Sequence, residues 1–262
     1  MQAHQHLTAP FVYEVIRRQG EMELNRPAAS LWWSGIAAGI ALSTSVFCKA
    51  ILHQHLPDEA WRPLITNFGY CVGFVIVILG GLQLFTEQTV TAILPLLAHR
   101  SRRSLQRTAR LWGIVLLANL VRSLFAALLA TKVAFAHDAH LVAALEVSRR
   151  FTENTPWRVV AHGVLAGFFI GTLVWMLPSA RGSEFWVIVL ITYFIGAGEF
   201  AHIIAVSTEV FLLMLAGEIR PLATITAFIL PAMIGNIIGG TVLFSLLAYA
   251  QVRQEMPERD TD

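Results

Sequence analysis

Long apolar runs are the feature that most limits what this chain can fold into. About 20 residues of α-helix cross the roughly 30 Å hydrocarbon core of a bilayer. Only 14% of the residues are charged, whereas a soluble domain carries about 25%. We therefore predict an all-α polytopic membrane protein with six membrane segments, at residues 31–52, 68–99, 111–130, 159–177, 185–215 and 222–250.

The second and fifth runs are too long for one crossing each. Residues 68–99 are interrupted by GGLQLFTEQT at 80–89, and residues 185–215 by GAGEFAHIIAVST at 196–208. Over-long, glycine-interrupted segments at matching places in two halves are typical of broken helices around a midplane binding site. Such backbone is tolerated at membrane depth only where protein buries it or where it lines a watery cavity.

The two halves of the chain also share short patterns. Residues 35–44 and 163–172 both read G-x-x-A-G-x-x-x-x-T, and Asn119 in ANLVRSLF corresponds to Asn236 in GNIIGGTVLF. Three segments per half make the halves inverted repeats, at about 30–131 and 158–250. Chance recurrence of small residues in packed membrane helices is the alternative explanation.

The distribution of arginine predicts how the chain is oriented. Residues 99–110 hold five Arg and no acid, which places this connection in the cytoplasm by the positive-inside rule. Six crossings then put both termini in the cytoplasm. We expect an amphipathic cytoplasmic segment at 1–29, a channel domain at 30–252 and a cytoplasmic tail at 253–262, with membrane lipids as the surroundings.

Three motifs resemble the formate/nitrite transporter family: GGLQLFT, GEFAHIIA and IGNIIGG. The resemblance covers about residues 25–252, and the residue departures indicate the YfdC-like branch. It implies an aquaporin-like six-helix fold with broken second and fifth helices, in the inner membrane of a bacterium. It also implies a homopentamer with one pore per protomer, which passes small weak-acid anions such as formate, nitrite or hydrosulfide.

The resemblance assigns roles to single residues. The pore histidine corresponds to His202 and its hydrogen-bonding threonine to Thr86. The two apolar constrictions fall near Phe74 and Ile195. Tyr70 and Phe194 are expected close to these constrictions. The residues expected to support the pore are Phe85, Glu87, Phe200, Asn119 and Asn236.

Several departures from the family bear on the solute. Ala201 stands where the family has a glutamate before the histidine, and Glu199 lies three residues before His202. Glu199 is placed with the central layer, where it could pair with His202 on one helix face or accept backbone N–H groups at the break. We expect Glu87 and Glu209 to be structural partners in loops or at a subunit interface. If Glu87 or Glu199 faced the pore ionised, a neutral solute or water would be favoured over an anion.

A histidine at mid-membrane suits weak-acid transport, because its ordinary pKa of about 6.5 lets small environmental changes decide its charge. Moving an unpaired, ionised anion out of water into a low-dielectric interior costs several kcal/mol or more. An intramembrane enzyme could use Glu199 and His202 as acid and base, but the sequence offers no further set of catalytic residues. We therefore predict that the protein is not an enzyme. We predict no cofactor, and no metal site at the histidines of the predicted outer loops, His53, His55, His137 and His140. We also predict no nucleic-acid partner, because topology and anionic lipid explain the basic residues at 100–110.

Overall fold

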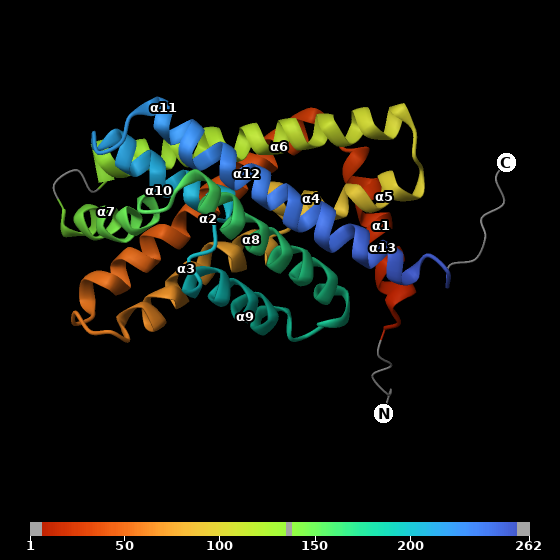
Figure 1. Ribbon diagram of the computed structural model, residues 1–262, viewed down its shortest axis with the longest axis horizontal. Coiled ribbons are helices and arrows are strands. Elements are labelled where there is room, and N and C mark those ends of the chain that lie inside the picture. Colours follow the sequence, from red (N-terminus) through yellow and green to blue (C-terminus); the bar gives the residue numbers. More distant parts are fainter. Residues whose placement is uncertain (1–6, 135–137, 256–262) are drawn as a thin grey trace.

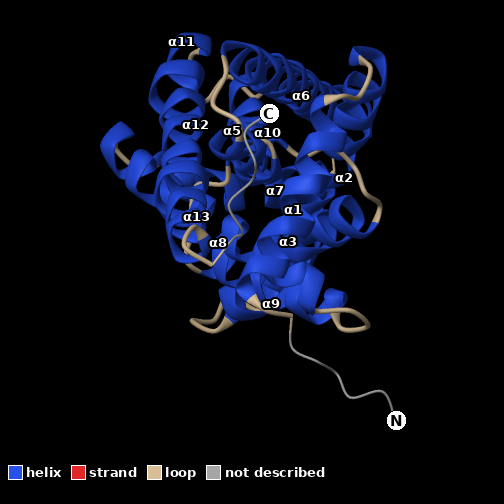
Figure 2. Cartoon of the chain, turned by 90° about the vertical axis from the view of Figure 1, so that its right-hand side faces the viewer, coloured by secondary structure: helices blue, strands red, loops and turns tan. Residues whose placement is uncertain are grey.

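A computed structural model describes residues 7–134 and 138–255, and the described residues are helices joined by short loops (Figures 1 and 2). Residues 1–6, 135–137 and 256–262 lie outside the described residues. They include His137 and most of the predicted cytoplasmic tail. The first half contains α1 (Ala9–Leu24), α2 (Ala28–His55), α3 (Arg62–Leu79), α4 (Phe85–Thr91), α5 (Ile93–Ala98), α6 (Arg102–Leu129) and the π-helical η1 (Ala130–Ala134). The second half contains α7 (Ala139–Thr152), α8 (Pro156–Met176), η2 (Leu177–Ser179), α9 (Glu184–Ala197), α10 (Ile203–Leu215), α11 (Pro221–Ala223), η3 (Thr224–Ile229), α12 (Leu230–Ile237), η4 (Ile238–Ser245) and α13 (Leu246–Val252).

The predicted membrane architecture is confirmed. Five helical stretches are long and apolar enough to cross a membrane: 28–55, 62–79, 102–133, 156–179 and 221–252. The fifth crossing is divided between the shorter apolar helices α9 and α10. The second crossing continues past α3 into α4 and α5, so both broken helices lie where the glycine-interrupted runs are.

Each break has a local cause in its backbone. The chain leaves α3 through Gly80 and Gly81, and Gly81 has φ of +61°, a left-handed conformation that glycine adopts without steric cost. The second break runs through Gly198 into Glu199, which has φ of +52° although it is not glycine. A non-glycine residue in this region is uncommon and persists only where its surroundings fix it.

Small residues let the crossing helices approach closely. A Cβ added to Gly239 of η4 would lie 2.0 Å from the carbonyl oxygen of Val164 in α8. One added to Gly167 of α8 would lie 2.4 Å from the carbonyl oxygen of Asn236 in α12. Backbone-to-backbone packing of this kind is the usual role of small residues between membrane helices.

The molecule has two distinct ends. Figure 1 shows α1, α5 and α13 at one end of the long axis, and α7 and α11 at the other. The rings of Tyr13 in α1 and Tyr249 in α13 lie 6.0 Å apart, so the first and last described helices share one end. An even number of crossings between them agrees with the six predicted. Below, these are the α1 end and the α7 end.

Two helices occupy segments that the sequence analysis treats as connections. α6 begins at Arg102, inside the basic stretch 99–110, where the Ser101 hydroxyl accepts a hydrogen bond from the Ser104 N–H. α7 occupies residues 139–152 of the predicted outer loop, with Asp138 accepting a hydrogen bond from the His140 N–H at its start. Its buried residues recur at helical spacing: Ala143, Ala144, Val147, Ser148 and Phe151.

Candidate functional site

Two asparagines hold the broken helices in matching ways. The Asn119 carboxamide oxygen accepts a hydrogen bond from the N–H of Phe85, the first residue of α4, at 3.0 Å. Its nitrogen donates to the carbonyl oxygens of Gln83, in the break, and of Gly35, in α2. One fully buried side chain therefore bonds two backbone groups at the break, which lack a helical partner there, and ties them to α2.

Asn236 repeats this arrangement in the second half. Its oxygen accepts from the N–H of Ile203, the first residue of α10, at 3.0 Å. Its nitrogen donates to the carbonyl oxygens of Ala201, in the break, and of Gly163, in α8. Gly35 and Gly163 are the first residues of the shared sequence pattern, so the two sets of contacts are related residue by residue.

The two breaks bring His202 and Thr86 together. Nε2 of His202 lies 2.8 Å from the Thr86 hydroxyl oxygen, and both side chains are fully buried. Thr86 is in the first turn of α4, and His202 directly precedes α10. Nδ1 of His202 is buried and has no hydrogen-bond partner among the described residues. The imidazole therefore keeps one polar atom that the protein itself does not use.

Aromatic rings connect this imidazole with a cavity nearer the α7 end. The Phe74 ring lies edge-on to His202, with ring centroids 4.8 Å apart, and packs against Tyr70 one turn earlier in α3, at 5.3 Å. Tyr70 and Ile195 line the cavity, and Phe74 and Ile195 are fully buried. The Phe74 ring therefore contacts both His202 and Tyr70, a residue that lines the cavity.

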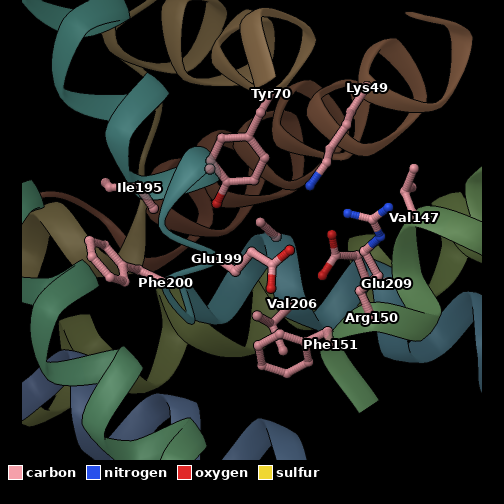
Figure 3. Close-up of a pocket in the computed structure, with 12 residues that line it drawn as sticks. Lys49, Tyr70, Val147, Arg150, Phe151, Ile195, Glu199, Phe200, Val206 and Glu209 are labelled. Atoms are coloured by element: carbon pink, nitrogen blue, oxygen red, sulfur yellow. The ribbon is translucent and has the colours of Figure 1, made fainter. Parts of the chain in front are cut away.

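The cavity itself is lined by polar and charged side chains (Figure 3). It has a volume of about 30 Å³, which is room for a water molecule. Figure 3 shows side chains from α2, α3, α7, α10 and the second break around it. Its polar and charged lining residues are Lys49, Tyr70, Arg150, Glu199 and Glu209.

The other residues singled out from the sequence lie around this axis or away from it. Phe85 packs its ring against Trp112, and Phe200 lines the cavity with its ring against Phe169. Phe194 is 51% exposed, so its ring lies on the surface of the protomer instead of beside Ile195. Glu87 is partly buried, and its Oε1 has no hydrogen-bond partner among the described residues.

Glu199 does not lie on a shared helix face with His202. Residues 199–202 are not helical, so the three-residue spacing does not set the two side chains one above the other. The Glu199 carboxylate lines the cavity, while its backbone carbonyl oxygen accepts a hydrogen bond from Nδ1 of His162 at 3.1 Å. Of the two placements left open, neither the pairing with His202 nor acceptance of backbone N–H groups is seen.

Sequence reasoning missed three charged residues of the cavity. Lys49 is the single lysine of an apolar run, which is a signal in itself because intramembrane charges are costly. Arg150 is on α7, a helix that the sequence analysis does not predict. Glu209 is expected in a loop or subunit interface, but it is 7% exposed and lies inside the protomer. Its helical register on α10 depends on where the break ends, which the sequence does not fix.

Comparison with known proteins identifies this architecture. The family model described as Formate/nitrite transporter matches residues 10–250, nearly the whole chain. The chain belongs to the formate/nitrite transporter family. It is 37% identical over 248 residues to the Inner membrane protein YfdC of Escherichia coli (strain K12), covering 95% of this chain and 80% of that protein. It is 24% identical over 251 residues to the Uncharacterized transporter YrhG of Bacillus subtilis (strain 168), covering 91% of each.

Solved structures of formate/nitrite transporters share the fold. A structure described as "FNT family ion channel" superposes with a TM-score of 0.76 at 23% identity, covering 94% of this chain and 97% of that one. Another, "Pentameric formate channel with formate bound", superposes with a TM-score of 0.72 at 21% identity, covering 86% and 98%. This confirms the resemblance in family and in fold, including the broken second and fifth helices.

Three of the histidines from the predicted outer loops, His53, His55 and His140, are described by the structure, and the ring centroids of His55 and His140 lie 6.4 Å apart. His53 Nε2 lies 3.3 Å from Glu146, and His140 Nδ1 lies 2.9 Å from Asp138. Within residues 7–134 and 138–255, no group of three or more His, Cys, Asp or Glu side chains is placed to hold a metal ion.

Proposed function

We propose that this protein is a membrane channel or transporter for a small monovalent weak-acid anion of the formate and nitrite class, moved as the anion or as its neutral acid. Membership of the formate/nitrite transporter family supports the class of function. The observation that carries the solute path is the buried contact between His202 and Thr86, at the junction of two broken helices. A channel or transporter, not an enzyme, is the function that this arrangement serves.

The route we propose runs through one protomer. From the α7 end, the solute enters the charged cavity, passes Ile195 and Phe74, and reaches a polar layer made by His202 and Thr86. The apolar side chains exclude hydrated ions, because stripping water from an ion in low dielectric costs several kcal/mol or more. The unpartnered Nδ1 of His202 offers the solute a polar contact beyond this seal.

The assembly and location follow the family. We propose a homopentamer with one pore per protomer, as in the related channel that is described as pentameric. We place it in a bacterial inner membrane, as its relative YfdC is described, with the α7 end outside and both termini in the cytoplasm. The arginine-rich stretch at 100–110 lies at the start of α6, near the α1 end, and supports this orientation.

Uptake into liposomes tests the function. Purified protein is reconstituted, and uptake of labelled formate and of nitrite is measured at several external pH values. We expect uptake above that of empty liposomes, faster at lower pH, and reduced about tenfold or more in His202→Asn. His55→Asn changes an exposed histidine outside the route and is expected to match the wild type.

The cavity carboxylates motivate one alternative. Glu199 and Glu209 would repel anions if their charges were not balanced, and a neutral solute or water would then pass in place of an anion. Water or glycerol flux without formate or nitrite uptake, measured by light scattering on the same liposomes, would favour that function over ours.

A further inference from the structure

The polar and charged side chains that line the cavity at the α7 end lack hydrogen-bond and ion-pair partners within the described residues. Among the described residues, the side chains of Lys49, Tyr70, Arg150, Glu199 and Glu209 form no hydrogen bond or ion pair, and the Lys49 ammonium lies 6.0 Å from the centroid of the Tyr70 ring. Polar groups at membrane depth are costly without a partner, and ordinary structural charges pair with one another. Tyr70 and Glu209 are buried, Lys49 is partly buried, and Arg150 and Glu199 are exposed. The turning of all five groups to one small cavity indicates a site that is filled by water and solute (Figure 3).

Glu209 is the group that ordinary packing explains least. Its side chain is on α10, is 7% exposed, and points into the cavity among Tyr70, Lys49 and Glu199. A carboxylate buried without a donor is costly, and an ionisable residue within a membrane segment is a functional-site candidate by default.

Glu199 is held at the same cavity by an unusual backbone. Its φ of +52° is a conformation that glycine adopts more easily, so a glutamate here costs stability. The bond from His162 goes to the backbone carbonyl oxygen of Glu199, which every residue type has. The presence of glutamate at this position must therefore be explained by its side chain. That side chain faces the cavity.

The charges around the cavity balance without a solute. Lys49 from α2 and Arg150 from α7 oppose Glu209 from α10 and Glu199 from the break, with neutral Tyr70 from α3 between them. His53 lines a second cavity together with Lys49, Arg150 and Glu199. An entering monovalent anion adds one negative charge, and one proton taken up by a carboxylate restores the balance. Anion entry and proton uptake therefore favour each other, reciprocally.

We propose that Glu209 and Glu199 form a proton-holding pair that protonates the anion in this cavity, before the apolar seal, while Lys49 and Arg150 hold the anion there. This inference rests on the proposed transport function and assigns its coupling to named residues. The solute class is a monovalent anion of a weak acid, small enough to enter beside Tyr70.

The proton transfer is balanced. The O–H bond of a protonated Glu209 or Glu199 breaks, an O–H bond forms on the anion, and the carboxyl group is left ionised. The neutral acid then leaves the cations and passes Ile195 and Phe74. A proton from water at the α7 end restores the carboxylic acid. No oxidant, reductant or metal is needed.

Reconstituted full-length protein provides the test. Formate uptake and the accompanying proton uptake, read by a pH dye inside the liposomes, are measured between external pH 5.5 and 8 for Glu209→Gln, Glu199→Gln and the double variant. We expect the double variant to lose about tenfold or more of the uptake rate and the rise in rate at low pH, because general acids typically contribute about 10²-fold or more. Glu209→Asp is expected to restore part of the pH dependence.

A matched control and a spectroscopic measurement separate this role from a structural one. Glu153→Gln, an exposed acid at the same end, should keep the wild-type rate and profile. In the infrared, adding formate to wild-type protein should strengthen the carboxylic-acid C=O band, and the double variant should lack that change. Lys49→Met should raise the formate concentration for half-maximal uptake.

The outcomes distinguish this inference from the proposed function. Wild-type protein that takes up no formate or nitrite would overturn the proposed function. Wild-type uptake together with an unchanged rate and pH profile in the double variant would overturn only the carboxylate pair. If the variants do not fold, a wild-type infrared spectrum without the formate-induced band overturns the pair on its own.

Discussion

At the residue scale, two side chains contact the His202 imidazole, and one of them forms a hydrogen bond with it. The Thr86 hydroxyl engages Nε2 at 2.8 Å, and the Phe74 ring packs against the edge of the imidazole. A threonine hydroxyl can both donate and accept, so this contact persists in either tautomer of the histidine. Thr86 can therefore fix the ring while its protonation changes.

Removing that hydroxyl tests the orienting role. Thr86→Val keeps the side-chain volume and deletes one hydrogen bond, of a kind worth about 0.5–1.5 kcal/mol. We expect formate uptake in liposomes to fall about 2- to 10-fold while the melting temperature changes little. Thr172→Val removes an exposed hydroxyl that bonds only within its own helix and should leave uptake unchanged. Uptake by Thr86→Val equal to that of the wild type would show that His202 needs no such partner.

At the element scale, the breaks were predictable but their geometry was not. Glycine pairs inside over-long apolar runs locate both interruptions, and Asn119 and Asn236 are recognisable as equivalent positions. The sequence does not show that each asparagine bonds two backbone groups at a break and one carbonyl oxygen of a neighbouring helix. Their partners are up to 84 residues distant in the chain, and only the folded helices bring them within reach.

The cavity was out of reach of sequence reasoning for a related physical reason. A three-residue spacing joins Glu199 to His202 only on a continuous helix, and the left-handed turn at Glu199 breaks that periodicity. The carboxylate is turned into the cavity as a result. The α7 residues were missed because a short amphipathic helix at a membrane surface lacks the long apolar run that identifies a crossing.

The asparagine contacts predict a large stability effect. Asn236→Ala leaves the N–H of Ile203 and the carbonyl oxygen of Ala201, both at the break, without this partner, at about 1–3 kcal/mol for each group left unsatisfied. We expect the apparent melting temperature in detergent to fall by about 5–20 °C, at about 2–4 °C per kcal/mol for a chain of this size. Asn119→Ala should behave similarly.

Asn154→Ala is the matched control, because its side chain makes one local hydrogen bond to Phe151 at the end of α7. Its melting temperature should stay close to that of the wild type. Equal melting temperatures for Asn236→Ala and Asn154→Ala would mean that the breaks are held by packing alone.

At the scale of the whole molecule, exposed side chains mark a membrane between the two ends. Exposed tryptophans stand at the start of crossing helices, Trp33 and Trp186 towards the α1 end and Trp61 and Trp157 towards the α7 end. Tryptophan favours the two membrane interfaces, whereas leucine, isoleucine and phenylalanine favour the lipid between them. The long axis in Figure 1 therefore lies along the expected membrane normal.

The arginine-rich stretch then decides which end faces the cytoplasm, and site-specific labelling checks it. In protein with Cys48 changed to Ser, one exposed residue at each end is replaced by cysteine: Glu153→Cys at the α7 end and Arg103→Cys at the start of α6. A membrane-impermeant maleimide added to intact cells should label Glu153→Cys at once and Arg103→Cys only after the membrane is permeabilised. The reverse pattern would place the charged cavity on the cytoplasmic side, and the proposed carboxylate pair would then draw its protons from the cell interior.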